Sequence, residues 1–169
     1  MPWHECVTPP AAIHNTSEPA AEPLNEPSEN GRRAADGTIA AVPSRVVRPA
    51  NIAPPAARYA HAVATTGAQR WLHTSGVVPT RPDGSVADDT AEQARTVWHN
   101  ISAMLAESDM TRSDIVSVTT YVVPGQDLAA VMAERDRFLA GHLVASTLVV
   151  VPELAQPAWK VEIAVIAAH

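Results

Sequence analysis

Segments with helical periodicity alternate with segments of strand periodicity along this chain, and the alternation restricts the folds open to it. The clearest segment begins at Asp89, which stands three residues before Glu92 in a capping-box pattern typical of a helix start. Apolar residues then recur at the spacing of one helix face: Ala94, Val97, Trp98, Ile101, Met104 and Leu105. A second helix is predicted from about Asp127 to Gly141, with one side formed by Leu128, Val131, Met132, Arg135, Phe138 and Leu139.

Strand patterns surround these helices. Residues 58–66 alternate as a half-buried strand does, and residues 71–76 return after Gly67, which predicts a β-hairpin. Further strands are predicted at residues 44–48, 116–123, 146–151 and 159–167. The main order is strand, strand, helix, strand, helix, strand, strand. This order indicates an α+β fold in which both helices pack on one face of a sheet that includes parallel pairing.

Composition divides the chain into two parts. The 169 residues suffice for one domain with an appendage. Residues 1–41 are rich in Pro and Glu and nearly lack β-branched or aromatic residues, so we expect a disordered acidic tail there. Residues 42–169 form the predicted domain. Its uncovered sheet face favours burial against other subunits.

Charge and cysteine content exclude several function classes. The net charge of −6 disfavours binding to nucleic acid, because the chain has no positive field to hold a phosphate backbone. The only cysteine is Cys6, which fits a reducing cytoplasm. The sequence contains neither an apolar run of membrane-spanning length nor a signal-peptide pattern, and it has no phosphate-loop, dinucleotide or zinc motif. We therefore expect a cytoplasmic protein with no membrane, metal or cofactor partner.

The polar residues that could carry chemistry fall on the predicted strands. Because strand side chains repeat every two residues, three pairs each share a face: Tyr59 with His61, His73 with Ser75, and Lys160 with Glu162. If these faces meet, a phenol, an imidazole, a hydroxyl and a carboxylate converge, and the carboxylate can hold or transfer a proton. The alternative is that Glu162 forms an exposed ion pair with Lys160.

Short motifs along the chain resemble the reactive intermediate deaminase (Rid) family, also called YjgF or L-PSP. The resemblance covers roughly residues 44–168. It rests on the order and spacing of five pieces: Tyr59-Ala-His-Ala-Val63, Thr74-Ser75-Gly76, Gln93 through Asn100-Ile101, Asp114-Ile-Val116 and Val161-Glu162-Ile163.

The resemblance implies a chorismate-mutase-like subunit and a homotrimer with small-molecule pockets between neighbouring subunits. It also implies hydrolysis of 2-imino or 2-enamino acids without metal or cofactor. Carried over by position, Glu162 activates water, and Tyr59 and Ser75 line the pocket beside Gly76. His73 stands where the family has an apolar residue and is a candidate second proton carrier.

One departure concerns the arginine with which the family binds the substrate carboxylate. Counting back from Leu154, the corresponding segment contains Ala145 and Ser146, and no arginine follows Arg137. A serine hydroxyl cannot replace the bidentate bonds of a guanidinium. We therefore expect a small reactive imine, enamine or related carbonyl-derived metabolite other than a free 2-imino acid.

Two alternatives remain open. In the first, the protein is a conventional 2-iminobutanoate/2-iminopropanoate-type deaminase in which Lys160 or an arginine of a neighbouring subunit supplies the cation. In the second, it is a noncatalytic ligand-binding trimer whose acidic tail engages a partner.

Overall fold

The computed structural model describes residues 44–169, so the predicted tail of residues 1–41 lies outside the described residues. The elements follow in the order β1 (Ser44–Val47), β2 (Ala62–Thr65), β3 (Trp71–His73), α1 (Thr90–Glu107), the 3₁₀ helix η1 (Arg112–Asp114), β4 (Ile115–Val122), α2 (Leu128–Leu139), β5 (Ala145–Val150) and β6 (Val161–Ala168). None of the helices in this part of the chain combines the length and the apolar character needed to cross a bilayer.

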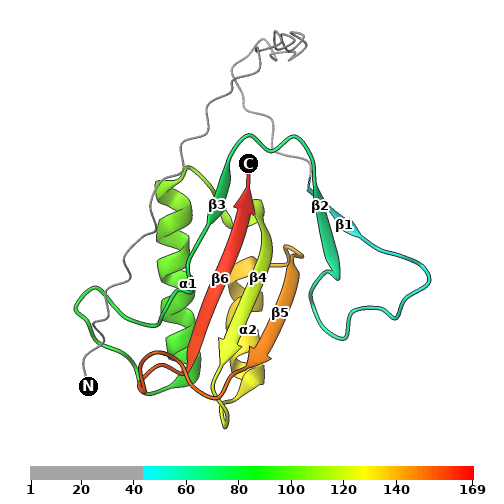
Figure 1. Ribbon diagram of the computed structural model, residues 1–169. Coiled ribbons are helices and arrows are strands. Elements are labelled where there is room, and N and C mark those ends of the chain that lie inside the picture. Colours follow the sequence, from blue (N-terminus) through cyan, green and yellow to red (C-terminus); the bar gives the residue numbers. More distant parts are fainter. Residues whose placement is uncertain (1–43) are drawn as a thin grey trace, which may run out of the picture. The chain divides into compact units, whose positions relative to one another are not determined.

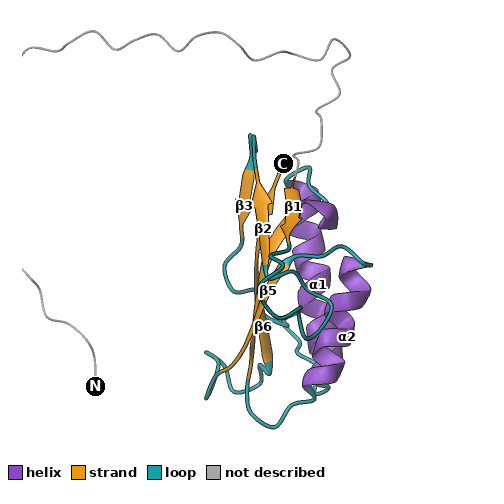
Figure 2. Ribbon diagram, turned by 90° about the vertical axis from the view of Figure 1, so that its right-hand side faces the viewer, coloured by secondary structure: helices purple, strands orange, loops and turns teal. Residues whose placement is uncertain are grey.

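The main sheet has four strands in the order β3-β6-β4-β5 (Figure 1). β4 and β5 are parallel and are connected through α2, whereas β6 runs antiparallel to both β4 and β3. Within residues 44–169 both helices lie on one face of this sheet, and no helix covers the other, which we call the open face (Figure 2). The predicted α+β architecture with a mixed sheet is therefore confirmed.

α1 starts as its capping pattern predicts. The Asp89 carboxylate accepts a hydrogen bond from the backbone N–H of Glu92 at 2.8 Å, which satisfies one of the free donors of the first turn. The predicted apolar stripe is buried against the sheet with one exception, Met104, which is 41% exposed near the C-terminal end of the helix. The core beneath α1 consists of side chains from both helices and the central strands, among them Ile101, Leu105, Val118, Val131, Ile163 and Val165.

The predicted β-hairpin between residues 58–66 and 71–76 is wrong. β2 pairs antiparallel with β1 in a separate two-stranded sheet, and β3 pairs with β6. After Gly67 the backbone N–H groups of Gln69 and Arg70 donate to the carbonyl of His169, so the chain turns toward the C-terminal strand rather than back onto β2. Local alternation predicted two strands correctly, but it carries no information about which distant strand each one pairs with.

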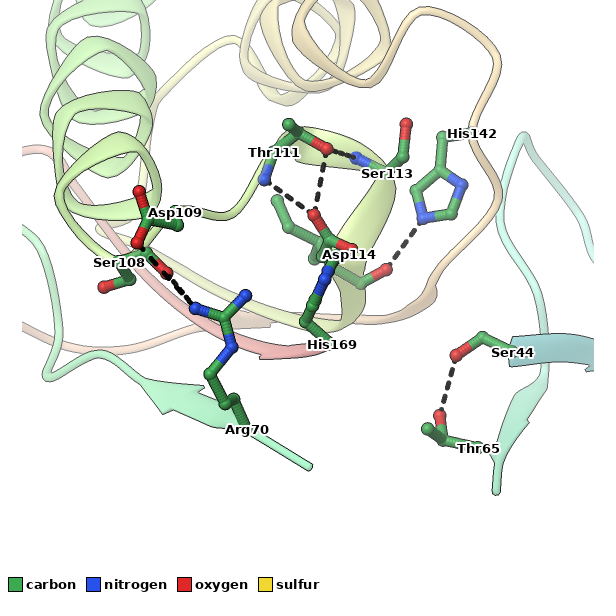
Figure 3. A network of polar contacts seen from close by, with 11 residues as sticks. Ser44, Thr65, Arg70, Ser108, Asp109, Thr111, Ser113, Asp114, His142 and His169 are labelled. Carbon is green, nitrogen blue, oxygen red and sulfur yellow. Dashed lines mark hydrogen bonds and ion pairs between the residues drawn. The ribbon is translucent and has the colours of Figure 1, made fainter. Parts of the chain in front are cut away.

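A polar network joins the end of β6 to the start of β4 (Figure 3). The Asp114 carboxylate accepts hydrogen bonds from the backbone N–H of Thr111 at 2.7 Å and from its hydroxyl at 2.9 Å, and it lies 3.1 Å from Nδ1 of His169. Burial alone raises the pKa of Asp114, but the hydrogen bonds from Thr111 and His169 outweigh burial and hold the pKa below its ordinary value. A carboxyl group with a lowered pKa in the folded state stabilises the fold at neutral pH, and this contribution is lost as the pH falls through the folded-state pKa.

Asp114→Asn should therefore lower the free energy of unfolding at pH 7 by about 1 kcal/mol, because the neutral amide loses charge-assisted hydrogen bonds. The difference from the wild type should begin to shrink as the pH falls below about 4, the ordinary pKa of an unfolded-state aspartate, and it should disappear only below the lower folded-state pKa of Asp114. Urea unfolding between pH 7 and pH 2 measures both quantities. Asp88→Asn, at an exposed position, is the control and should leave the curve unchanged. A constant difference across the pH range would contradict the assignment.

Candidate functional site

Glu162 lies on the open face of β6. The strand alternates between buried residues that face the helices, such as Val161 and Ile163, and half-buried residues that face the other way, including Glu162 and Ala164. Tyr121 of β4 is the cross-strand partner of Glu162, so the carboxylate lies beside a tyrosine near the start of β6 and the end of β4. Among residues 44–169 Glu162 forms no ion pair, because every observed pair involves other carboxylates.

Gly76 leaves the space that the Glu162 side chain occupies. The segment that contains Gly76 runs along β6, where Val77 and Ile163 exchange backbone hydrogen bonds of 2.8 and 3.1 Å. A Cβ atom on Gly76 would lie 1.7 Å from Oε1 of Glu162 and 2.9 Å from its Cγ. Only a residue without a side chain permits this approach, so Gly76 and Glu162 form one unit.

Ser75 precedes Gly76, and His73 is the last residue of β3. Together with Gly76 they line a groove of about 800 Å³ between the residues after β3 and α1. Asn100 of α1 holds the far side of the groove, because its amide donates to the carbonyl oxygens of Val78 at 3.3 Å and Thr80 at 3.1 Å. Glu162 does not line this groove, and the cross-strand partner of His73 is Ile166, four residues along β6 from Glu162. Strand spacing and rise place the Cα atoms of His73 and Glu162 about 14 Å apart, so the structure brings Glu162 to Gly76 and its neighbour Ser75 but not to His73.

Lys160 does not face Glu162. Its ammonium group donates to the backbone carbonyl of Asp88, and its backbone N–H donates to Oε1 of Gln93 at 2.8 Å. Gln93 is fully buried and also donates to the carbonyls of Ala87 at 2.7 Å and Ala158 at 2.9 Å. Lys160 therefore binds the loop that precedes α1 and the first turn of that helix. The described residues contain no Lys160–Glu162 ion pair.

Tyr59 lies elsewhere in the subunit. It lines a cavity of about 420 Å³ beneath the loop that connects β1 and β2, which we call the loop cavity. Its ring meets that of His61 edge-on, with 5.7 Å between the ring centres. Ala60 follows it and forms a parallel bridge with Ala145 at the start of β5, where the N–H of Ala60 donates to the carbonyl of Val144 at 2.8 Å.

Ser146 points to the helix side of the sheet, where its hydroxyl accepts a 3.1 Å hydrogen bond from Arg135 of α2. Arg135 is 3% exposed, forms an ion pair with Asp136 at 2.7 Å and donates to the backbone carbonyl of Arg58 at 3.1 Å. Paired residues of neighbouring strands point to the same face of the sheet. Ser146 pairs with the buried Val118 on the helix side, so the preceding residue, Ala145, lies on the open face with its partner Ser117. Ser146 thus anchors the buried Arg135 of α2, a contact that the helical spacing of Arg135 does not reveal.

The predicted site residues therefore form two separate groups within one chain. Tyr121 of β4 pairs with Glu162 of β6 on one side and with Val149 of β5 on the other, so Glu162 and Val149 lie at the same level, two strands apart. Val149 is four residues along β5 from Ala145. Strand spacing and rise place the Cα atoms of Glu162 and Ala145 about 16 Å apart. A small molecule cannot touch the Glu162 group and the Tyr59 group of the same subunit. The described residues also hold no cluster of three His, Cys, Asp or Glu side chains suited to a metal ion.

Comparison with known proteins identifies the family. Residues 50–169 match the family described as Endoribonuclease L-PSP. A RutC family protein of Haemophilus influenzae is 41% identical over 66 residues, which are 38% of this chain and 51% of that protein. A 2-iminobutanoate/2-iminopropanoate deaminase of Salmonella typhimurium is 36% identical over 70 residues, which are 41% of this chain and 55% of the deaminase. The matches thus span about half the length of these curated relatives.

A solved structure extends the likeness to the whole fold. The conserved Rid family protein YyfB of Yersinia pestis, of unknown function, superposes with a TM-score of 0.69 at 30% identity, over 75% of this chain and 98% of that one. The chain therefore belongs to the Endoribonuclease L-PSP family, the Rid or YjgF family that its motifs resemble.

Proposed function

We propose that this protein is a homotrimer that hydrolyses small imines or enamines, without metal or cofactor, in sites shared between neighbouring subunits. One observation carries the proposal: Tyr59 and the Gly76–Glu162 unit lie too far apart within a chain to act on one molecule. If the Tyr59 of one subunit lies against the Glu162 of the next, each interface completes one site. The similarity to the Salmonella typhimurium deaminase supports the reaction class.

The open face of the sheet supports the assembly. It carries no helix within the described residues, yet Trp71 is 52% exposed and Val149 is 40% exposed on it. Large apolar side chains on an uncovered sheet face favour burial against another protein surface. In a closed ring of identical subunits this burial brings the same two surfaces together at every interface.

The chemistry requires one acid/base group. Glu162 accepts a proton from water as the water oxygen bonds to the imine carbon, and it passes this proton to the imine nitrogen to give a tetrahedral amino alcohol. Glu162 then takes the hydroxyl proton as the carbonyl forms and the C–N bond breaks, and it delivers this proton to the leaving nitrogen, which departs as ammonia. Ser75 and Tyr59 donate hydrogen bonds to the oxygen and nitrogen that carry charge during these steps.

Glu162→Gln should lower the turnover of such imines about a hundredfold or more, because the amide cannot accept the proton of the attacking water. A small imine without a carboxylate is the substrate for this proposal, and imines generated from several amino acids by an amino-acid oxidase test the conventional 2-imino acid alternative. Ammonia release above the spontaneous rate measures turnover of both. Glu153→Gln, at an exposed position of the β5–β6 loop, is the control. Unchanged turnover in Glu162→Gln would contradict the role assigned to Glu162, whereas no turnover above the spontaneous rate in the wild type would favour a noncatalytic ligand-binding trimer.

Gly76→Ala should lower turnover nearly as much as Glu162→Gln while the protein still folds. The new methyl group displaces the end of a flexible side chain, so the carboxylate moves away from its working position. The double variant should be no worse than either single variant, because both remove the same group. Circular dichroism and the turnover assay together check this, and additive losses would contradict a shared origin.

Subunits that carry Tyr59→Phe and subunits that carry Glu162→Gln should rescue each other when they are unfolded, mixed in equal amounts and refolded. A site that draws its two halves from different chains is intact in about a quarter of cases, so turnover should recover to about that fraction of wild type. Each variant refolded alone is the control. Recovery no greater than the average of the two controls would place both residues in one chain.

A further inference from the structure

The two helices form a groove on the side of the sheet away from the open face (Figure 2). We call it the helix groove, and its volume is about 260 Å³. Its polar and aromatic lining includes Arg95, Trp98, His99 and Ser102 of α1 and Glu134 and Arg137 of α2. An adjoining hollow of about 380 Å³ shares Arg95 and His99 with it. The helix groove therefore has room for a small ion and, beside it, for an attached organic group.

Two guanidinium groups bind one buried carboxylate in this groove. Glu134 is 5% exposed, and its two oxygens are used by different arginines. Oε1 accepts a hydrogen bond from Nη2 of Arg95 at 2.8 Å, and Oε2 accepts one from Nη1 of Arg137 at 2.6 Å. The side chains of Arg95 and Arg137 are themselves 57% and 65% exposed. Glu134 therefore holds two guanidinium groups close together at the surface.

Each of these guanidinium groups keeps most of its donors. A guanidinium has five N–H donors, and within residues 44–169 Arg95 and Arg137 each donate only to Glu134. Their two positive charges exceed the single negative charge of Glu134. The other carboxylates that act on Arg95 have partners of their own, because Glu92 forms a separate ion pair at 2.5 Å and Asp89 caps α1. The helix groove therefore presents unused donors and an excess of positive charge to an anion.

The indole of Trp98 gives a second, independent indication of a ligand. Trp98 is 2% exposed and stacks on Phe138, with 4.7 Å between the ring centres. Its Nε1 is the only buried side-chain nitrogen or oxygen of the described residues that has no hydrogen-bond partner. A buried donor without an acceptor is unfavourable. The residues that line the helix groove thus include an unsatisfied donor as well as two guanidinium groups.

We propose that the helix groove binds a small phosphate dianion through Arg95 and Arg137. Two oxygens of a phosphate accept parallel bonds from one guanidinium, and the dianion balances the excess positive charge. His99 and Ser102 are exposed in the same lining and supply further donors. The site lies on the other side of the sheet from Glu162, so it does not depend on the proposed reaction.

The charge of the whole chain limits the size of the anion. A net charge of −6 repels an extended polyanion such as a nucleic acid. A small anion interacts mainly with the groups next to it, because salt screens exposed charges that lie farther away. The helix groove is therefore suited to free phosphate or to the phosphate group of a small ester.

Calorimetric titration of the full-length protein with inorganic phosphate and with methyl phosphate, at constant ionic strength, tests the proposal. Wild type should bind one phosphate group per subunit, and Arg95→Gln and Arg137→Gln should each weaken this binding about tenfold or more. Arg112→Gln is the matched control, because Arg112 is an exposed arginine of η1 outside the groove lining. Tighter binding of methyl phosphate than of inorganic phosphate would assign the site to phosphate esters, and the reverse would assign it to the free ion.

The indole N–H signal of Trp98 in a proton–nitrogen correlation spectrum locates the binding. Its loss in Trp98→Phe assigns the signal, which should shift during the phosphate titration while the signals of Trp71 and Trp159 stay unchanged. No saturable binding below about 10 mM phosphate would overturn the site. Equal losses in Arg95→Gln and Arg112→Gln would also overturn it, because they would reflect net charge alone.

Discussion

The alternation of side chains along β6 organises the subunit. This eight-residue strand is paired on both edges, with β3 on one side and β4 on the other. Val161, Ile163, Val165 and Ala167 face the helices and are almost completely buried, so they fix which face of the sheet is covered. The residues between them necessarily face the other way. A single acidic residue in this strand is therefore presented on the open face, and its register against β4 sets its position.

A buried charge organises the opposite edge of the sheet. Arg135 is removed from water but satisfies its donors with Asp136, Ser146 and the carbonyl of Arg58. A buried guanidinium is tolerated only when its hydrogen bonds are made. Separating it from any of the three partners would leave a buried charge unpaired, so the contacts hold the partners in place. The same contacts connect α2, β5 and the β1–β2 loop. The loop cavity thus depends on an interaction that lies on the other side of the sheet.

These two arrangements explain why Glu162 and Tyr59 lie apart within one chain. The Gly76–Glu162 unit belongs to the β3–β6 half of the sheet, and Tyr59 belongs to the edge beyond β5. Neither half has both the carboxylate and the phenol, so the proposed reaction would require assembly. The open face between them is the surface that another subunit would cover.

The periodicity of the sequence determined much of this protein. Helix starts at Asp89 and Asp127, the strand around Glu162 and the mixed sheet follow from local spacing, because capping and side-chain alternation depend on near neighbours. The family motifs pointed to Gly76 and Glu162, which are in contact, and to Ser75, the residue before Gly76. Only the tertiary structure decided that β3 pairs with β6 rather than with β2, that Ser146 faces Arg135, and that Tyr59 lies apart from Glu162. Strand pairing, register and the burial of an arginine depend on residues far apart in the chain, and a one-residue change of register reverses every side chain, so no local pattern contains them.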